Sequence, residues 1–196
     1  MVKKAIMLII AGYFISLTQS CCVNEYNCKW TGFNIQAIDN SGKEPIVRFN
    51  YINKKALGFR ISMTDTILHI AQRSNIIAEC RATSCGIRLN KLHTMTSIVI
   101  KTIYDYSEVL PAGSDITFLF KARNAEKIKE DYVAIDDIIS YINNTEISYG
   151  QKTDDFDLYL IDDTCTGGLQ KFEIRIFLSD GAILVKWTDN LLLQNQ

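Results

Sequence analysis

The chain has 196 residues, and 47% of them are hydrophobic. This hydrophobic content excludes an intrinsically disordered chain and is enough to build a substantial core. The 21 basic and 22 acidic side chains give a net charge of −1, which does not support nucleic-acid binding. The length suits one domain, and no internal repeat or Pro/Gly/Ser-rich linker divides it.

The first twenty residues predict a signal peptide. Lys3 and Lys4 form a charged start, and an uncharged run of 13 residues follows from Ala5 to Leu17. That run is too short for a membrane-spanning helix, which needs about 20 apolar residues. A charged start, a short apolar run and small residues before the cleavage point are the parts of a secretory signal. A buried helix at the start of the domain is the alternative.

Cys21 directly follows this segment. A cysteine at the first mature position is typical of bacterial lipoproteins, and Thr18-Gln19-Ser20-Cys21 is a loose form of their cleavage motif. The strict motif has leucine three positions before the cysteine, whereas Leu17 lies one position earlier. We expect lipidation of Cys21, which attaches the protein to the bacterial outer membrane on its periplasmic or surface face. Ordinary signal peptidase cleavage after Ser20 is the alternative.

Strands are predicted where apolar and polar residues alternate. In chain order, this pattern covers residues 26–38, 56–63, 97–104, 116–122 and 155–161. Residues 65–77 are ambiguous between a helix and a strand. The clearest pattern is a hairpin near the end, in which Asp180-Gly181 turns the chain between two alternating segments.

One helix is predicted over residues 126–143. Its apolar residues recur at three- and four-residue intervals, and Asp131 suits the N-cap. Together these elements predict a mainly β fold, an antiparallel β-sandwich (immunoglobulin-like or similar) with one inserted helix. We expect residues 1–20 to form the signal peptide, residues 21–30 a lipid-anchored tether, and residues 31–196 a single sandwich domain.

The cysteines suggest disulfides, because export places them in an oxidising compartment. Cys80 and Cys85 are close enough to close a small loop, and Cys22 and Cys28 are close enough to close another. Cys165 is then the odd thiol, although spacing alone does not determine connectivity. A zinc site is the alternative for Cys80 and Cys85, but no neighbouring histidine completes a ligand set.

Three carboxylates cluster at Asp154, Asp155 and Asp157. A hydrolase that acts on carbohydrates needs two carboxyl groups about 5–10 Å apart, and calcium prefers such oxygen ligands, so these residues are candidates for both. The run lacks the alternating acids and the distal glutamate of a calcium-binding loop. A solvated sheet face is the favoured interpretation. His69 and His93 stand outside any metal-binding motif.

Two further features concern sugars: a possible site of sugar attachment and a set of aromatic residues. Asp65-Thr66-Ile67 is similar to the acceptor for O-glycosylation in Bacteroidota, which makes Thr66 a candidate site. Tyr26, Trp30 and Trp187 could stack on a sugar ring, but a tryptophan on an alternating strand is more often part of the core. We therefore expect both tryptophans to be buried.

The chain resembles a family of uncharacterised Bacteroidota lipoproteins of similar length. The resemblance rests on CCVNEYNCKWTGFNIQAIDNSG, AGSDITFLF and FEIRIFLSDGAILVKWTDNLLL, which follow in the same order. It implies export, lipidation of the first mature cysteine and a sandwich-like domain. It brings no known catalytic residues, so none is carried over to this chain.

These observations favour a non-enzymatic, lipid-anchored envelope protein that binds or assembles with a partner. We expect a protein or a glycan as the partner, and we expect the lipid to attach the protein to the membrane. The sequence has no nucleotide-binding loop and no nucleophile elbow, so we expect neither a cofactor nor a catalytic serine. A hydrolase that uses the acids near residues 154–157 is the first alternative. A calcium-stabilised adhesin-like subunit is the second.

Overall fold

The computed structural model describes residues 23–68, 86–125, 131–145, 147–148, 155–162 and 164–194. Several sequence predictions lie outside these residues: the signal peptide, Cys21, Cys22, His69, Cys80, Cys85 and Asp154. Within the described residues, the fold is mainly β, with mostly antiparallel sheets in a sandwich and a single α-helix. The predicted fold class is therefore confirmed.

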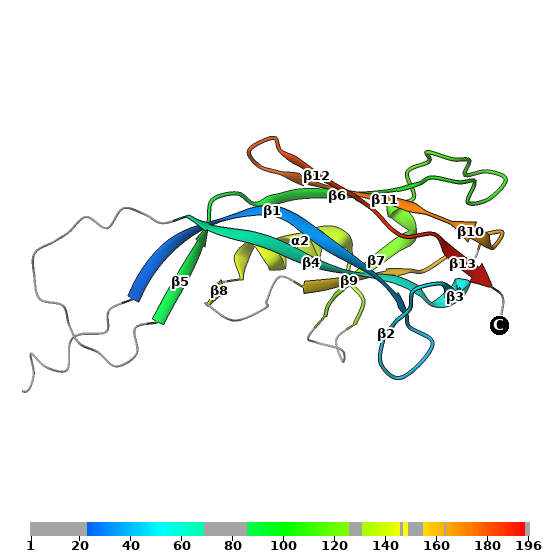
Figure 1. Ribbon diagram of the computed structural model, residues 1–196, viewed down its shortest axis with the longest axis horizontal. Helices are drawn as coiled ribbons and strands as arrows, with labels where there is room; N and C mark the ends of the chain where they lie inside the picture. The colour runs from blue at the N-terminus through cyan, green and yellow to red at the C-terminus, as the bar shows by residue number, and fades with distance from the viewer. Residues whose placement is uncertain are drawn as a thin grey trace, which may run out of the picture.

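Two long strands form the centre of the larger layer (Figure 1). β1 (Val23–Asp39) pairs antiparallel with β4 (Leu57–Leu68) from Asn27 to Asp39. The strand order among the described residues is β7-β9-β4-β1-β5-β8, and β2 also pairs with β1. The bounds of these strands are β2 (Ile46–Val47), β5 (Gly86–Lys91), β7 (Phe120–Asn124), β8 (Ile147–Ser148) and β9 (Asp155–Leu160).

Two smaller sheets complete the strand framework. One has the order β12-β11-β6 and forms the second layer, with β6 and β12 above β1 and β4 in Figure 1. The other has the order β10-β13-β3 and lies at the end of the molecule that carries the C-terminus. Their bounds are β3 (Tyr51–Asn53), β6 (Met95–Thr102), β10 (Gly168–Gln170), β11 (Phe172–Leu178), β12 (Ile183–Trp187) and β13 (Leu191–Gln194).

The core joins the two layers through aromatic rings in contact with one another. The ring of Phe59 on β4 lies 5.7 Å from that of Phe120 on β7 and 5.3 Å from that of Phe172 on β11. All three side chains are buried because they occupy the inward positions of alternating strands. The predicted hairpin is present between β11 and β12, and Gly181 adopts φ +85° in its turn.

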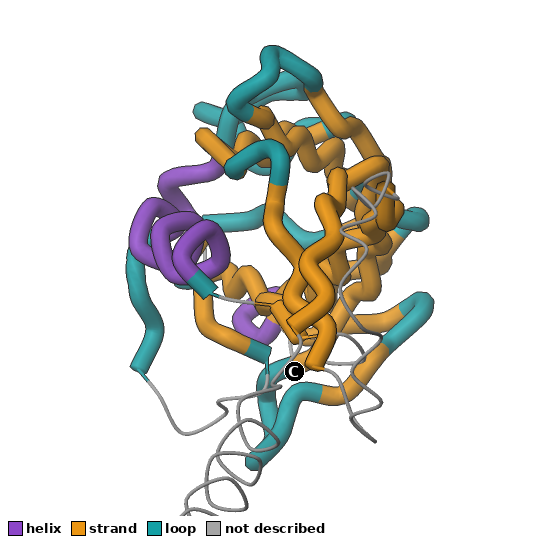
Figure 2. Tube along the Cα trace, turned by 90° about the vertical axis from the view of Figure 1, so that its left-hand side faces the viewer, coloured by secondary structure: helices purple, strands orange, loops and turns teal. Residues whose placement is uncertain are grey.

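The helix α2 (Ile135–Asn144) packs against β6 and β7 and lies at one side of the strands (Figure 2). Ile138, Ile139 and Ile142 bury its apolar face. The prediction placed its start too early, because the N-cap is Ala134 and Asp131 is not part of the helix. Asp136 and Asp137 in the first turn favour this start, since carboxylates stabilise the positive end of a helix dipole.

The strand predicted over residues 116–122 is partly wrong. The carboxylate of Asp115 accepts a hydrogen bond from the Thr117 backbone N–H at 2.9 Å, and the short 3₁₀ helix η2 (Thr117–Leu119) begins there. β7 follows only at Phe120. The ambiguous stretch from residue 65 continues β4 as far as Leu68. A second 3₁₀ helix, η1 (Lys54–Ala56), connects β3 to β4.

Candidate binding cleft

The acidic residues of β9 are part of a buried polar network. Phe156, Leu158 and Leu160 point into the core, so Asp157 and Tyr159 lie on the opposite face of the sheet. Asp157 is nevertheless fully buried. Its carboxylate accepts hydrogen bonds from Nε and Nη2 of Arg60 at 2.8 and 2.9 Å and from the hydroxyl of Tyr159 at 2.8 Å.

A second arginine extends this network. Arg123 Nη2 donates to the Tyr159 hydroxyl at 2.7 Å, and the guanidinium lies 4.9 Å from the Tyr159 ring centre and 5.3 Å from that of Tyr132. Burial raises the pKa of Tyr159, and its hydrogen bond to Asp157 raises it further. The hydrogen bond to Asp157 also raises the pKa of Arg60. These contacts connect side chains of neighbouring strands, so we interpret the network as one that stabilises the sheet.

This arrangement corrects the interpretation of Asp157 as a solvated residue. A buried carboxylate whose oxygens accept three hydrogen bonds is poorly placed to ligate calcium or to attack a substrate. Asp155 is half-buried on the same face. Among the described residues, no group of acidic, histidine or cysteine side chains is placed to hold a metal ion.

The other sequence candidates are separated from one another. Thr66 is exposed on β4, opposite Lys29 of β1. Trp30 is buried as expected, whereas Trp187 on β12 is 55% exposed, so the prediction of a buried Trp187 is wrong. Tyr26 is half-buried near the start of β1.

Two cysteines and one histidine discussed from the sequence also lie in the described part of the structure. Cys28 and Cys165 are both buried, and Cys165 is a free thiol whose pKa is raised by burial. The Cys165 sulfur accepts a hydrogen bond from the backbone N–H of Gly167. His93 Nε2 lies 3.4 Å from a carboxylate oxygen of Asp180 in the hairpin turn.

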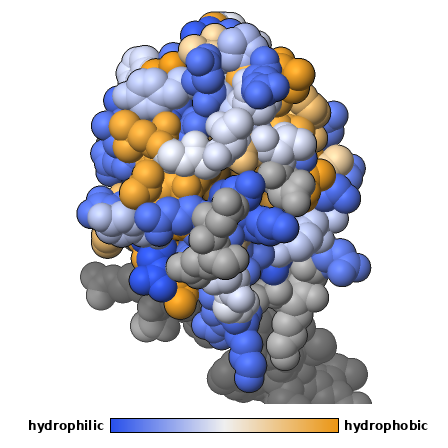
Figure 3. Space-filling model, turned by 90° about the vertical axis from the view of Figure 1, so that its right-hand side faces the viewer, coloured by the Kyte–Doolittle hydropathy of each residue, from blue (hydrophilic) through white to orange (hydrophobic). Residues whose placement is uncertain are grey.

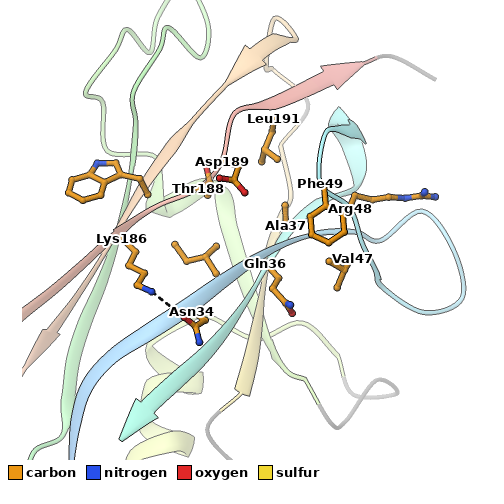
Figure 4. Close-up of a pocket in the computed structure, with 12 residues that line it drawn as sticks. Asn34, Gln36, Ala37, Val47, Arg48, Phe49, Lys186, Thr188, Asp189 and Leu191 are labelled. Atoms are coloured by element: carbon orange, nitrogen blue, oxygen red, sulfur yellow. Dashed lines mark hydrogen bonds between the residues drawn. The ribbon is translucent and has the colours of Figure 1, made fainter.

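A polar cleft lies between β1 and the end of β12 (Figure 4). We call it the β1–β12 cleft, and its volume is about 220 Å³. Three separate segments line it: residues 34–37 of β1, residues 47–49 at and after β2, and residues 186–189 with Leu191 at and after β12. Of the lining residues, the sequence had singled out only Trp187, as a residue that could stack on a sugar ring; the others look like ordinary strand ends.

The cleft brings together hydrogen-bonding groups and an aromatic ring. Lys186 spans it and donates from Nζ to the Asn34 side-chain oxygen at 3.1 Å. Asp189 lies on the wall opposite Asn34 in Figure 4. Phe49 lies at the other end of the cleft and is 73% exposed. A few polar groups beside an exposed ring are typical of a binding site.

An open apolar hollow of about 540 Å³ lies elsewhere, between η2, β7 and the start of α2. Phe118 and Ile161 line it and are more than half exposed. Other exposed hydrophobic residues lie near the end that carries β3, β10 and β13, where Figure 3 shows apolar groups among polar ones. They include Tyr51 on β3 and Leu169 on β10.

Comparisons with known proteins add no family. No protein-family model, curated protein or solved structure matches the chain. Among the described residues, no helix combines the length and apolar character needed to cross a membrane.

Proposed function

We propose that the protein is a non-enzymatic, lipid-anchored module of the bacterial outer membrane, and that the β1–β12 cleft binds its partner. The export and lipidation signals at residues 1–21 support the anchor. One structural observation supports the binding role above the others: exposed polar side chains from three distant segments converge on one hollow of the sandwich.

The cleft chemistry favours binding over hydrolysis. Among the described residues that line it, Asp189 is the one carboxylate, and none is a histidine or a cysteine. A glycosidase needs a second carboxyl group across the substrate. The acids of β9 do not supply it, because Asp157 is held by Arg60 and Tyr159. The hydrolase and calcium alternatives therefore have less support than a binding module.

The anchor is tested by exchanging Cys21 for serine. In a bacterial host that processes lipoproteins, we expect the wild-type protein to sediment with membranes and to carry an acyl mass on its first residue. Cys21→Ser should appear in the soluble fraction without that mass, because a hydroxyl does not form the thioether. The adjacent Cys22→Ser is the matched control and should remain acylated. A membrane-bound Cys21→Ser variant, with no acyl mass on the wild type, would contradict the proposal.

A further inference from the structure

The β1–β12 cleft carries charges of both signs. Among the described residues that line it, Lys186 and Arg48 are cationic and Asp189 is acidic, and all three side chains are exposed. A strongly anionic ligand would therefore meet Asp189, and a cationic ligand would meet Lys186 and Arg48. Like charges placed together weaken binding. The lining consequently favours a neutral ligand with many hydrogen-bonding groups.

Two side-chain amides on β1 add donors and acceptors to this lining. Asn34 and Gln36 are both exposed and lie two positions apart, so they point to the same face of the strand. Each amide offers N–H donors and a carbonyl acceptor within one planar group. Lys186 Nζ donates to the Asn34 side-chain oxygen at 3.1 Å, which holds that amide in one orientation. The side chains of Gln36 and Asp189 form no hydrogen bond to another described residue, so both are available to a ligand.

Phe49 contributes an apolar surface beside these polar groups. Its side chain is 73% exposed, and it lies next to Ala37 in Figure 4. Because Trp187 directly follows Lys186 on β12, its side chain points to the opposite face of that strand from Lys186. Phe49 is therefore the ring that faces a ligand held by Lys186. A ligand that covers this ring removes apolar area from water, which favours binding.

A saccharide combines the two properties that this lining requires. Each sugar hydroxyl both donates and accepts hydrogen bonds, so it matches amides, a carboxylate and cations within one cleft. One side of a pyranose ring presents C–H bonds and forms an apolar face. We propose that the β1–β12 cleft binds one sugar residue of a glycan, with its C–H face on Phe49 and its hydroxyl groups at Gln36 and Asp189. This inference rests on the proposed function, because it names the class of ligand that the cleft binds.

The size and the walls of the cleft limit other ligands. Its volume of about 220 Å³ is below the roughly 300–1,000 Å³ of most small-molecule pockets, so one ring enters and the rest of a longer glycan stays in solvent. An extended peptide would need backbone partners on β1. Phe33 is only 1% exposed, however, and the Ala37 carbonyl already accepts a hydrogen bond from the Arg48 N–H.

A glycan array provides the first test. Labelled full-length protein, in micelles of a detergent without a sugar head group, is applied to an array of bacterial and plant polysaccharides and neutral and acidic oligosaccharides. Calorimetry then gives the affinity of each bound oligosaccharide. We expect neutral oligosaccharides to bind. In NMR spectra of the wild-type complex, C–H protons of one sugar residue should shift upfield, because they lie over a phenyl ring. This measurement does not depend on the folding of a variant.

Variants of exposed residues locate the bound sugar. Phe49→Ala should weaken binding at least tenfold and abolish the upfield shift, because it removes the ring. Gln36→Ala and Asp189→Ala should each weaken binding about tenfold, because each removes hydrogen bonds to hydroxyl groups. Tyr51→Ala is the matched control: Tyr51 is an aromatic residue two positions from Phe49, 61% exposed and outside the lining, so the affinity should not change. Urea midpoints close to that of the wild type verify that each variant is folded.

Two results would overturn the saccharide inference: no glycan on the array binds, or folded Phe49→Ala and Asp189→Ala proteins bind glycans as tightly as the wild type. If peptides selected from a displayed random library then bind the wild type and Lys186→Gln removes that binding, the cleft is a binding site and only the saccharide inference fails. If neither glycans nor peptides bind, the binding role fails as well.

Discussion

The hydroxyl of Tyr159 connects two charges of opposite sign inside the protein. It accepts a hydrogen bond from Arg123 and donates one to Asp157, which is also paired with Arg60. A buried carboxylate is stable only when such donors replace its lost hydration. The tyrosine must therefore keep its proton, because a phenolate beside Asp157 would place two negative charges together.

This requirement predicts a pH dependence. Burial, followed by the hydrogen bond to Asp157, raises the pKa of Tyr159 above its usual value of about 10. Below about pH 10 the contribution to stability is complete. Above it the unfolded chain loses the proton while the native state keeps it, so the free energy of unfolding falls as the pH rises. Tyr159→Phe should flatten this decline in urea titrations carried out from about pH 10 upward.

The control for this prediction is Tyr51→Phe, which changes an exposed tyrosine. Both variants are best compared in a Cys165→Ala background, because burial also raises the pKa of that thiol and adds a decline of the same sign. An alkaline decline of equal slope in the Tyr159→Phe and Tyr51→Phe proteins would show that Tyr159 does not cause it.

Among the elements, β4 lies between β1 and β9, and Gly58 on β4 is packed closely by both neighbours. A Cβ atom at this position would lie 2.9 Å from Cγ1 of Ile38 and 2.9 Å from the backbone oxygen of Leu158. The backbone oxygen belongs to the paired strand β9, so it cannot move without disturbing the ladder.

Gly58→Ala is therefore expected to destabilise the protein by about 1–3 kcal/mol, the usual cost of overpacking a well-packed core. Urea denaturation at neutral pH measures the change in the free energy of unfolding. The control is Gly32→Ala on β1, where an added Cβ meets no atom within 4 Å. Equal losses at the two positions would show that the close approach at Gly58 is not the cause.

The sequence predicted the strands whose apolar and polar residues alternate within the strand itself. The alternation of β9 and the hairpin of β11 and β12 are local, so they were found in nearly the right place. β3 and β13 are short, and β3 depends on a parallel pairing with a distant part of the chain, which no local period reveals. The structure also has a second parallel pairing, between β1 and β5, that an antiparallel sandwich did not lead us to expect.

The candidate site was not predictable for a related reason. Lys186 and Asn34 meet across the cleft although they are 152 positions apart in the chain. Asp157 and Arg60 are 97 positions apart, so the sequence showed the acid without its partner. Exposed Trp187 was misassigned because a regular alternation says which residues share a face but not whether that face is covered.

At the scale of the whole molecule, the two layers share one core. Phe59 contacts an aromatic ring of its own sheet and one of the facing sheet, and a continuous cluster of buried side chains includes residues from both. The inner face of each sheet is covered by the facing sheet. The layers are therefore expected to unfold together as one cooperative unit.

The two tryptophans allow this to be measured. Trp187→Phe leaves Trp30 as the only tryptophan, and the change at an exposed position should alter stability by no more than about 0.5 kcal/mol. Trp30 then reports on the larger sheet, while far-UV circular dichroism reports on all strands. We expect the two urea transitions to coincide. Separate midpoints would mean that the sheets unfold independently.

The position of β13 has a consequence for biogenesis. Residues 191–194 lie between β10 and β3, so the strand at Tyr51–Asn53 has no partner in that small sheet until residues 191–194 have been synthesised. A nascent chain therefore holds β3 without its sheet partner until β13 has been made, and closure of the small sheet has to wait for that strand. On the export route that we propose, the small sheet is still open while the earlier part of the polypeptide crosses the membrane.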